Sequence, residues 1–290
     1  MSIRIITDSS SDISYDFADE NNIKVIPLSV SFEDKSYKED RTFDIDKHYD
    51  YYESNKNFFP KTSQPSPKEY YQVYNELIKD GAKDIIVICI SSALSGTLNS
   101  ARLASEMIKN EGKEVNIHLV DSLNASYSEV FLVKDALTQI KNGKNAETII
   151  KRLNLLVTKI KTFIVIPTLK YLHLGGRISI AKYLLARLLR KIVITQVNEK
   201  GANETASTVK SFEQGLEKLV ELTTEKNKRF PRKVAIVHAR NYEMAEKLKK
   251  IVREKIPNAE IEIVRTKVTI SAHTGPKAVA LISDFGEELK

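Results

Sequence analysis

Four polar segments of this chain are rich in serine and threonine, and each lies where the chain leads into a predicted helix or turn. They are 7–12 (TDSSSD), 62–66 (TSQPS), 91–97 (SSALSGT) and 121–126 (DSLNAS). Hydroxyls and the free N–H groups of helix N-termini donate hydrogen bonds to carboxylates or phosphates. Ser, Thr and Asp are also common helix caps, which explains any single loop. Several such loops at one sheet edge favour an anion site.

His273 is a further candidate for the anion site. It lies in Ser271–Pro276, where a strand predicted over 268–272 ends in a turn. A histidine at such a turn can donate a hydrogen bond to an anion, and a plain surface turn is an equal alternative. Four histidines have no partner at metal-ligand spacing and are interpreted as structural or surface residues: His48, His118, His173 and His238.

Catalytic motifs are incomplete or absent. Ser95, Asp121 and His273 follow the chain order of an α/β-hydrolase triad, but Ala93–Thr97 holds only half of the G-x-S-x-G elbow. The sequence contains neither a P-loop nor a dinucleotide-binding G-x-G-x-x-G. Three acidic residues could gather around Mg²⁺, although their spacing does not require a metal: Asp8, Asp12 and Asp121.

The composition is typical of a globular protein with about two domains. The chain has 290 residues, of which 42% are hydrophobic, so disorder along the whole chain is excluded. The only cysteine, Cys89, excludes a disulfide framework and a CxxC zinc site. The apolar run 85–90 is too short for a membrane span, and 1–8 lacks the apolar block of a signal peptide. We therefore expect a cytoplasmic protein without stable membrane insertion.

The charge does not indicate a nucleic-acid partner. Lys and Arg number 45 and Asp and Glu 38, which gives a net charge of +7. This excess is spread over the chain, Trp is absent, and no basic stripe alternates with aromatic residues. A solvated basic surface is therefore the favoured interpretation.

Strand and helix signals alternate in the first half of the chain. The best-defined helix, 66–79, has Ser66 and Glu69 as a capping box, Pro67 in its first turn and Gly81 after its end. Strands are predicted at 3–7, 24–32, 85–90 and 115–120, and helices at 44–54, 97–109 and up to 141. This rhythm predicts a mostly parallel, doubly wound α/β/α domain over residues 1–160.

The second half of the sequence differs in its pattern. Helices are expected at 146–160 and 178–190, from 211, and at 242–255. Strands are expected at 162–166, 234–238, 261–266, 268–272 and 279–282, with a hairpin of 191–198 and 205–209 around the turn 199–201. These short strands and tight turns predict an α+β domain with a partly antiparallel sheet over residues 161–290.

Six motifs, in this order, resemble the DegV family of bacterial fatty-acid-binding proteins. They are TDSSSD at 7–12, TSQP at 62–65, SSALSGT at 91–97, VDS at 120–122, YL at 171–172 with GGRIS at 175–179, and HTGP at 273–276. The resemblance covers nearly the whole chain. It implies a long-chain fatty acid buried between two domains.

The resemblance also implies the residues of the site. The carboxylate would be held by the Thr62 and Ser95 hydroxyls, with His273 close to the same head group. Ser63, Gly96 and Thr97 belong to the same motifs, and Arg177 would either pair with a carboxylate between the domains or approach the head group. Some family members present the bound acid to a fatty acid kinase, which makes an acyl phosphate. The binding protein then needs no catalytic residue, metal or cofactor.

Several points stay open at this stage. Tail-lining candidates are Ile164, Ile166, Leu184, Leu185, Leu188 and Leu189, although apolar residues at helical spacing are more often ordinary core. Lys277 replaces a glycine usual in the family, and it would either add a cation near the head group or point to solvent. The alternatives to a fatty-acid carrier are a serine hydrolase, a phosphoryl-transfer enzyme, or an interaction protein whose lipid is only structural.

Overall fold

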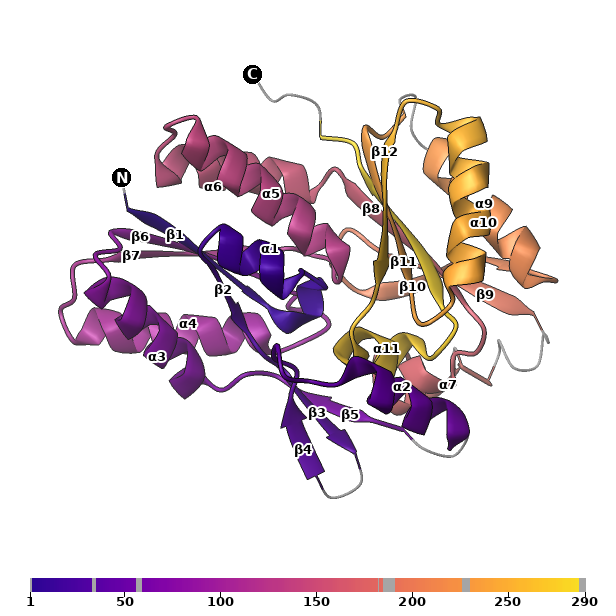
Figure 1. The fold of residues 1–290 in the computed structure, drawn as a ribbon, viewed down its shortest axis with the longest axis horizontal. Helices are drawn as coiled ribbons and strands as arrows, with labels where there is room; N and C mark the ends of the chain where they lie inside the picture. The colour runs from indigo at the N-terminus through magenta and orange to yellow at the C-terminus, as the bar shows by residue number, and fades with distance from the viewer. Residues whose placement is uncertain are drawn as a thin grey trace.

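A computed structural model describes residues 2–32, 35–55, 59–181, 183–184, 191–225 and 230–286. The described strands form three sheets (Figure 1). Most of the helix predicted over 178–190 lies outside the described residues, and so do Leu185, Leu188 and Leu189. The predicted fold class is confirmed: a parallel sheet between helical layers is joined to a second, mostly antiparallel sheet with helices.

The first sheet is parallel, with strand order β2-β1-β6-β7. Its strands are β1 (Ile3–Asp8), β2 (Ile23–Ile26), β6 (Asp84–Cys89) and β7 (Asn116–Asp121). One face packs on α3 (Pro67–Lys79) and α4 (Thr97–Asn110). The other face packs on α1 (Tyr15–Glu20), α5 (Tyr127–Lys141) and α6 (Ala146–Val157). Burial on both faces explains why residues 85–89 of β6 read as a continuous apolar run.

The predicted capping box at the start of α3 is confirmed. The Glu69 backbone N–H donates to Ser66 Oγ at 3.3 Å, and the Ser66 N–H donates to Glu69 Oε2 at 2.8 Å. Gly81 follows the helix with a φ of +81°, in the region that glycine adopts at least cost. These local signals therefore fix where α3 begins and ends.

The second sheet has the strand order β10-β9-β8-β13-β11-β12. Its strands are β8 (Ile160–Ile166), β9 (Ile192–Val197), β10 (Asn203–Val209), β11 (Lys233–His238), β12 (Glu260–Arg265) and β13 (Val279–Asp284). Among the described strand pairs of this sheet, only β11–β12 is parallel, and the predicted hairpin is the antiparallel pair β9–β10. Helices α9 (Phe212–Glu225) and α10 (Tyr242–Lys255) cover one face. Part of the other face packs on α5 and α6.

The boundary between the two predicted domains falls close to the start of the second sheet. Strand β8 begins at Ile160, and all later described strands belong to the same sheet as β8. We retain the division into 1–160 and 161–290 as a proposal.

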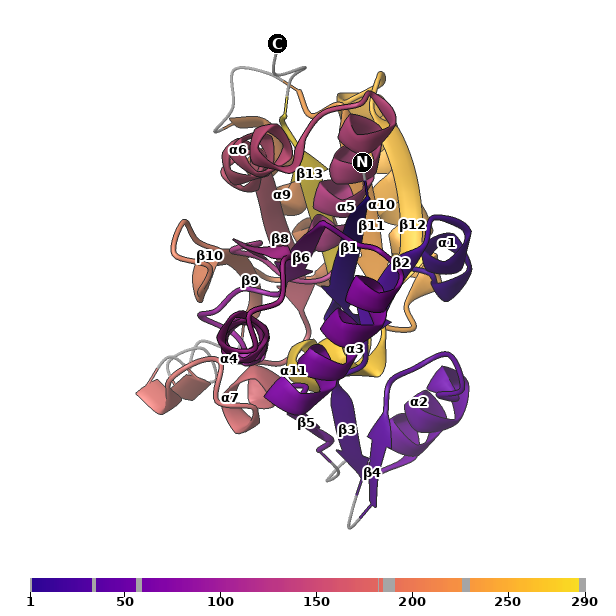
Figure 2. The same cartoon turned by 90° about the vertical axis from the view of Figure 1, so that its left-hand side faces the viewer.

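A small third sheet lies beneath the two large ones, beside α2 (Ile45–Ser54), α7 (Lys170–Leu174) and α11 (Val268–Thr274) (Figure 2). It consists of β4 (Lys35–Lys38), β3 (Ser29–Phe32) and β5 (Lys61–Ser63). The single strand predicted over 24–32 is wrong, because β2 and β3 belong to different sheets. Pro27 stands between them and offers no N–H to a sheet.

The strand predicted over 268–272 is also wrong, because these residues form α11. Its β-branched residues favour a strand in isolation. Two buried carboxylates accept the N–H groups at the start of the helix: Asp12 Oδ1 from Lys267 at 2.7 Å and Glu39 Oε1 from Thr269 at 2.9 Å. Tertiary contacts thus override the local preference.

Candidate ligand-binding site

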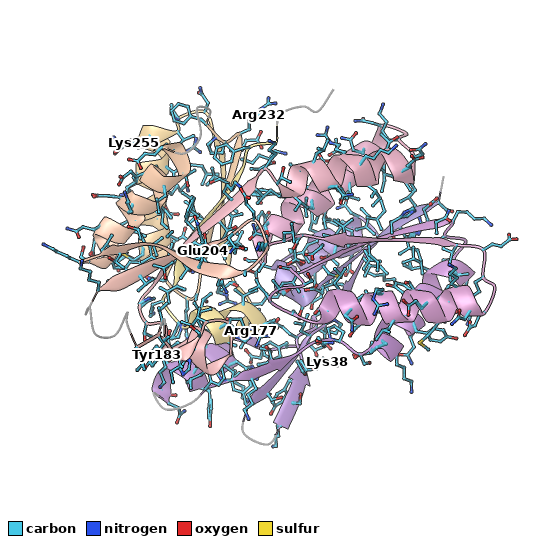
Figure 3. The ribbon with its side chains drawn as sticks, turned by 180° about the vertical axis from the view of Figure 1, so that it is seen from behind. Lys38, Arg177, Tyr183, Glu204, Arg232 and Lys255 are labelled. Carbon is cyan, nitrogen blue, oxygen red and sulfur yellow. The ribbon has the colours of Figure 1, made fainter. Side chains whose placement is uncertain are left out.

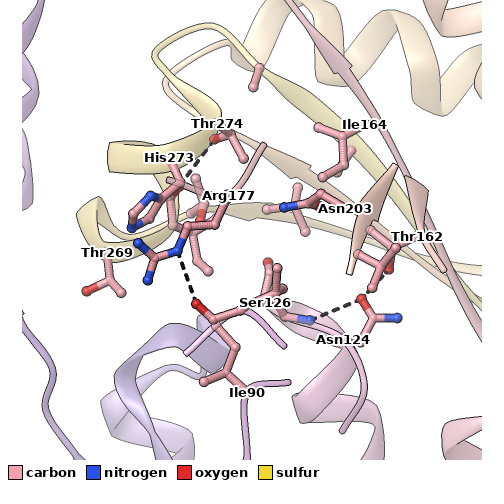
Figure 4. A pocket seen from close by; sticks show the side chains of 18 of the residues that line it. Ile90, Asn124, Ser126, Thr162, Ile164, Arg177, Asn203, Thr269, His273 and Thr274 are labelled. Carbon is pink, nitrogen blue, oxygen red and sulfur yellow. Dashed lines mark hydrogen bonds between the residues drawn. The ribbon is translucent and has the colours of Figure 1, made fainter. Parts of the chain in front are cut away.

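A cavity lies between the carboxyl edge of the first sheet and the open part of the second sheet (Figure 4). Its empty volume is about 880 Å³, including the space open to solvent at its mouth. Loops after β6 and β7, strands of the second sheet and helix α11 all contribute to its walls.

The apolar wall of the cavity comes from alternate residues of neighbouring strands. Ile164 and Ile166 of β8 face the cavity, and Ala280 of β13 is paired with Ile164. Side chains two apart on a strand share one face, so this periodicity follows from the strand itself. Two of the six tail-lining candidates, Ile164 and Ile166, therefore line the cavity. Leu184 is 53% exposed and is not among the lining residues.

Four of the predicted site residues gather at one end of this cavity: Thr62, Ser95, Arg177 and His273. Thr62 Oγ1 lies 2.8 Å from His273 Nε2, which joins β5 to α11. Ser95 Oγ lies 2.9 Å from Thr97 Oγ1. Seen from behind, Arg177 lies near the middle of the molecule, whereas Lys255 lies at its edge (Figure 3). This polar end combines hydroxyls, an imidazole and one guanidinium.

The Arg177 guanidinium is held in place by backbone carbonyl groups. Its Nε donates to Leu94 O at 3.1 Å, and its Nη1 donates to the carbonyl of Gly175. Burial lowers the pKa of Arg177, although a guanidinium stays charged at neutral pH. Its positive charge at the cavity wall favours a bound anion.

The other three predicted site residues do not line the cavity. Ser63 is exposed, and Thr97 is buried with its hydroxyl on Ser95. Gly96 lies against Gln64: a Cβ at position 96 would stand 2.0 Å from Gln64 Oε1. Gly96 therefore admits a neighbouring side chain of the protein, and Thr97 supports the hydroxyl of Ser95.

The His273 side chain is a neutral imidazole at the polar end of the cavity. Burial, together with the charge of Arg177, lowers the pKa of His273 to about 3. Because a neutral imidazole has one donor and one acceptor nitrogen, Nε2 either donates to Thr62 or accepts from it. A Cβ at position 175 would stand 2.2 Å from His273 Nδ1, so Gly175 permits this close approach.

The possible hydrolase triad is not assembled. Asp121 accepts backbone N–H groups of Ser92 at 3.3 Å and Leu123 at 2.9 Å. His273 is paired with Thr62, and Ser95 with Thr97. Ser95, Asp121 and His273 thus form hydrogen bonds to groups outside the possible triad and not to one another. In the part of the chain that the structure describes, no three His, Cys, Asp or Glu side chains are placed to hold a metal.

Lys277 points away from the cavity. Its Nζ donates to Arg240 O at 3.0 Å and lies 3.4 Å from Glu53 Oε1. Its φ is +67°, in the left-handed region that favours glycine. A glycine would adopt this conformation at least cost, and the solvent-facing alternative for Lys277 is the one observed.

The sequence predicts an anion-binding loop at 7–12, but this segment is buried and does not line the cavity. We call it the anchor, because its side chains hold the start of α11 in place. Ser9–Ser11 form a short 3-10 helix that Asp8 caps through the Ser10 N–H. Asp12 Oδ2 accepts from Thr266 Oγ1 at 2.8 Å and also from the Ser126 hydroxyl. This segment therefore positions α11, which carries His273.

Lys267 lies beside this anchor, and sequence reasoning missed it. Its Nζ is buried without a hydrogen-bond partner among the described residues and lies 4.4 Å from the Tyr15 ring centroid. Its charge interacts with four buried carboxyl groups: Asp8, Asp12, Glu39 and Glu129. Burial raises the pKa of each of these carboxyls, that of Glu39 to about 7, and lowers the pKa of Lys267. Its members are spread between positions 8 and 267, so no local sequence pattern indicates this cluster.

The comparison with known proteins identifies the family. The model of the DegV family, described as uncharacterised protein, matches residues 2–284. The chain therefore belongs to the DegV family, as its motifs indicate. A DegV domain-containing protein of Staphylococcus aureus strain N315 is 35% identical over 280 residues, which cover 96% of this chain and 97% of that protein.

Solved structures agree with the fold. The fatty acid binding DegV family protein from Streptococcus agalactiae has a TM-score of 0.89 at 26% identity, covering 99% of this chain and 100% of that chain. DegV, a fatty acid binding protein from Bacillus subtilis, has a TM-score of 0.87 at 27% identity, with the same coverage. Among the described residues, none of the helices has the length and apolar character needed to cross a bilayer.

Proposed function

We propose that this protein binds a long-chain fatty acid in the cavity between the sheets. Its carboxylate lies at Thr62, Ser95, His273 and Arg177, and its alkyl tail runs along Ile166 and Ile164. One observation carries the proposal: the cavity has polar groups gathered at one end and apolar strand residues leading away from it. Two solved relatives above 25% identity are fatty acid binding proteins by name, which supports this ligand class.

The tail supplies most of the affinity in this proposal. About fifteen methylenes buried at ~0.8 kcal/mol each give roughly 12 kcal/mol before costs. Association and ordering of the chain remove a large part of this gain, which leaves tight but reversible binding. Hydrogen bonds from Thr62 and Ser95, together with the charge of Arg177, then fix the orientation of the acid.

The proposed biochemical role is that of a carrier without catalytic residues. A fatty acid kinase transfers the terminal phosphoryl group of ATP to the presented carboxylate, which gives an acyl phosphate and ADP. Thr62 and Ser95 are both partly exposed, which would leave the carboxylate within reach of such an enzyme. Cys89 is a buried free thiol, which is compatible with the reducing cytoplasm that we propose as its location.

The head-group assignment predicts the effect of removing two hydroxyls. Thr62→Val combined with Ser95→Ala should weaken hexadecanoate binding about 100-fold or more, because hydrogen bonds to a charged group contribute roughly 1.5–3 kcal/mol each; the Arg177 charge remains. Binding is measured by isothermal titration on protein freed of lipid. The same variant should form less acyl phosphate with a bacterial fatty acid kinase and ATP.

The matched control is Ser63→Ala combined with Ser92→Ala. These two exposed serines neighbour Thr62 and the Ser95 loop but do not line the cavity. The control should bind hexadecanoate within about twofold of the unmodified protein. Equal affinity of the control and the double variant at positions 62 and 95 would place the carboxylate elsewhere.

A further inference from the structure

The end of the cavity remote from His273 is also polar. Figure 4 shows Asn124, Thr162 and Asn203 on the side opposite His273 and Arg177. Strand β8 runs between the two ends of the cavity. Its residues Thr162 and Ile166 both face the cavity and lie four residues apart, which is about 13 Å at ~3.3 Å per residue. A plain alkyl tail would therefore end among polar groups.

The amide of Asn124 has a fixed orientation. Its Oδ1 accepts from Thr162 Oγ1 at 2.9 Å and from the Ala125 backbone N–H at 3.0 Å. Both partners are donors, so the oxygen must face them and Nδ2 must face away. Asn124 is only 4% exposed, and within the described residues its Nδ2 has no hydrogen-bond partner. This N–H is not fully enclosed by the protein, so it remains open to an acceptor, and a ligand oxygen in the cavity would satisfy it.

The surroundings decide which kind of oxygen fits. The Asn203 side chain has no hydrogen bond to the described part of the protein and lines the same end. The Ser126 and Thr266 hydroxyls, which also line the cavity, already donate to Asp12. A second carboxylate would face the Asp12 carboxyl behind these hydroxyls, and the cation beside Asp12, Lys267, already interacts with four buried carboxyl groups. A neutral acceptor therefore suits Asn124 better than an anion does.

We propose that Asn124 and Asn203 form a second polar subsite that binds a neutral oxygen on the distal part of the acyl chain. The preferred ligand is then a long-chain fatty acid with a distal hydroxyl or keto group. This inference rests on the proposed function and specifies its substrate class.

The test compares four acids on protein freed of lipid: hexadecanoate and its 3-hydroxy, 12-hydroxy and 16-hydroxy derivatives. We expect at least one of the two distal derivatives to bind about two- to tenfold more tightly than hexadecanoate, as one added hydrogen bond allows. The 3-hydroxy derivative should show no such preference, because its oxygen stays near the carboxylate.

Two variants assign the effect to the subsite. Asn124→Leu should remove the preference for the distal derivative, and Asn203→Leu should reduce it without loss of any hydrogen bond within the described protein. Distal derivatives that bind the unmodified protein no more tightly than hexadecanoate would overturn the subsite while leaving the proposed function intact. Failure of all four acids to bind would overturn the proposed function, and the subsite with it.

Discussion

Ala280→Phe should abolish fatty-acid binding while the protein stays folded. Ala280 is 8% exposed and faces the cavity from β13, opposite Ile164. A phenyl ring there fills the path of the alkyl tail. Losing about four buried methylenes at about 0.8 kcal/mol each raises the Kd roughly 100-fold or more. Because the ring enters empty space, the free energy of unfolding should change by less than about 1 kcal/mol.

Ala245→Phe is the matched control for this substitution. Ala245 is fully buried on α10, in the packed core between the helices and the second sheet. The same added ring should lower the free energy of unfolding by about 1–3 kcal/mol through overpacking. Ala280→Phe destabilising the protein as much as Ala245→Phe, or binding hexadecanoate with unchanged Kd, would show that no tail occupies this space.

Asp12→Asn should be the most destabilising single change in the anchor beneath α11. The carboxylate of Asp12 accepts hydrogen bonds from the Lys267 N–H and from the hydroxyls of Thr266 and Ser126. An amide puts donors against these donors and removes a charge that interacts with Lys267. Asn tolerates the left-handed φ of +59° at this position, so the backbone adds little to the effect.

The expected loss in the free energy of unfolding is about 3 kcal/mol, the size seen when a buried charge loses its partner. Urea denaturation measures it. Asp16→Asn is the control: Asp16 is 80% exposed and paired with Arg41, so its loss should cost at most about 1 kcal/mol. The anchor account is wrong if the two variants are equally stable. Loosening of α11 should also weaken fatty-acid binding in Asp12→Asn, because α11 carries His273.

The sequence predicts those parts of the fold that local chemistry determines. The capping box of Ser66 and Glu69 fixes α3, and the turn at Gly201 places the hairpin β9–β10. The continuous apolar run of β6 correctly predicts a strand buried on both faces. The loops after β6 and β7 both contribute residues to the cavity wall, because carboxyl ends of parallel strands meet at one edge.

The remaining features depend on long-range contacts that spacing does not reveal. The β-branched residues 268–270 become helical because Asp12 and Glu39 accept the first N–H groups of α11. The serines of 7–12 look like anion donors, yet they are part of the buried anchor. The sequence does not predict the polar distal end of the cavity either, because Asn124 and Thr162 come together only across two sheets.

The most direct test of the central claim is the lipid content of the purified protein. Lipid is extracted from protein incubated with excess hexadecanoate and purified again, and it is quantified by mass spectrometry. We expect roughly one long-chain fatty acid per chain in the unmodified protein and almost none in Ala280→Phe. A chain that retains far less than one fatty acid, or as much in Ala280→Phe as in the unmodified protein, would contradict an acyl tail in the cavity between the sheets.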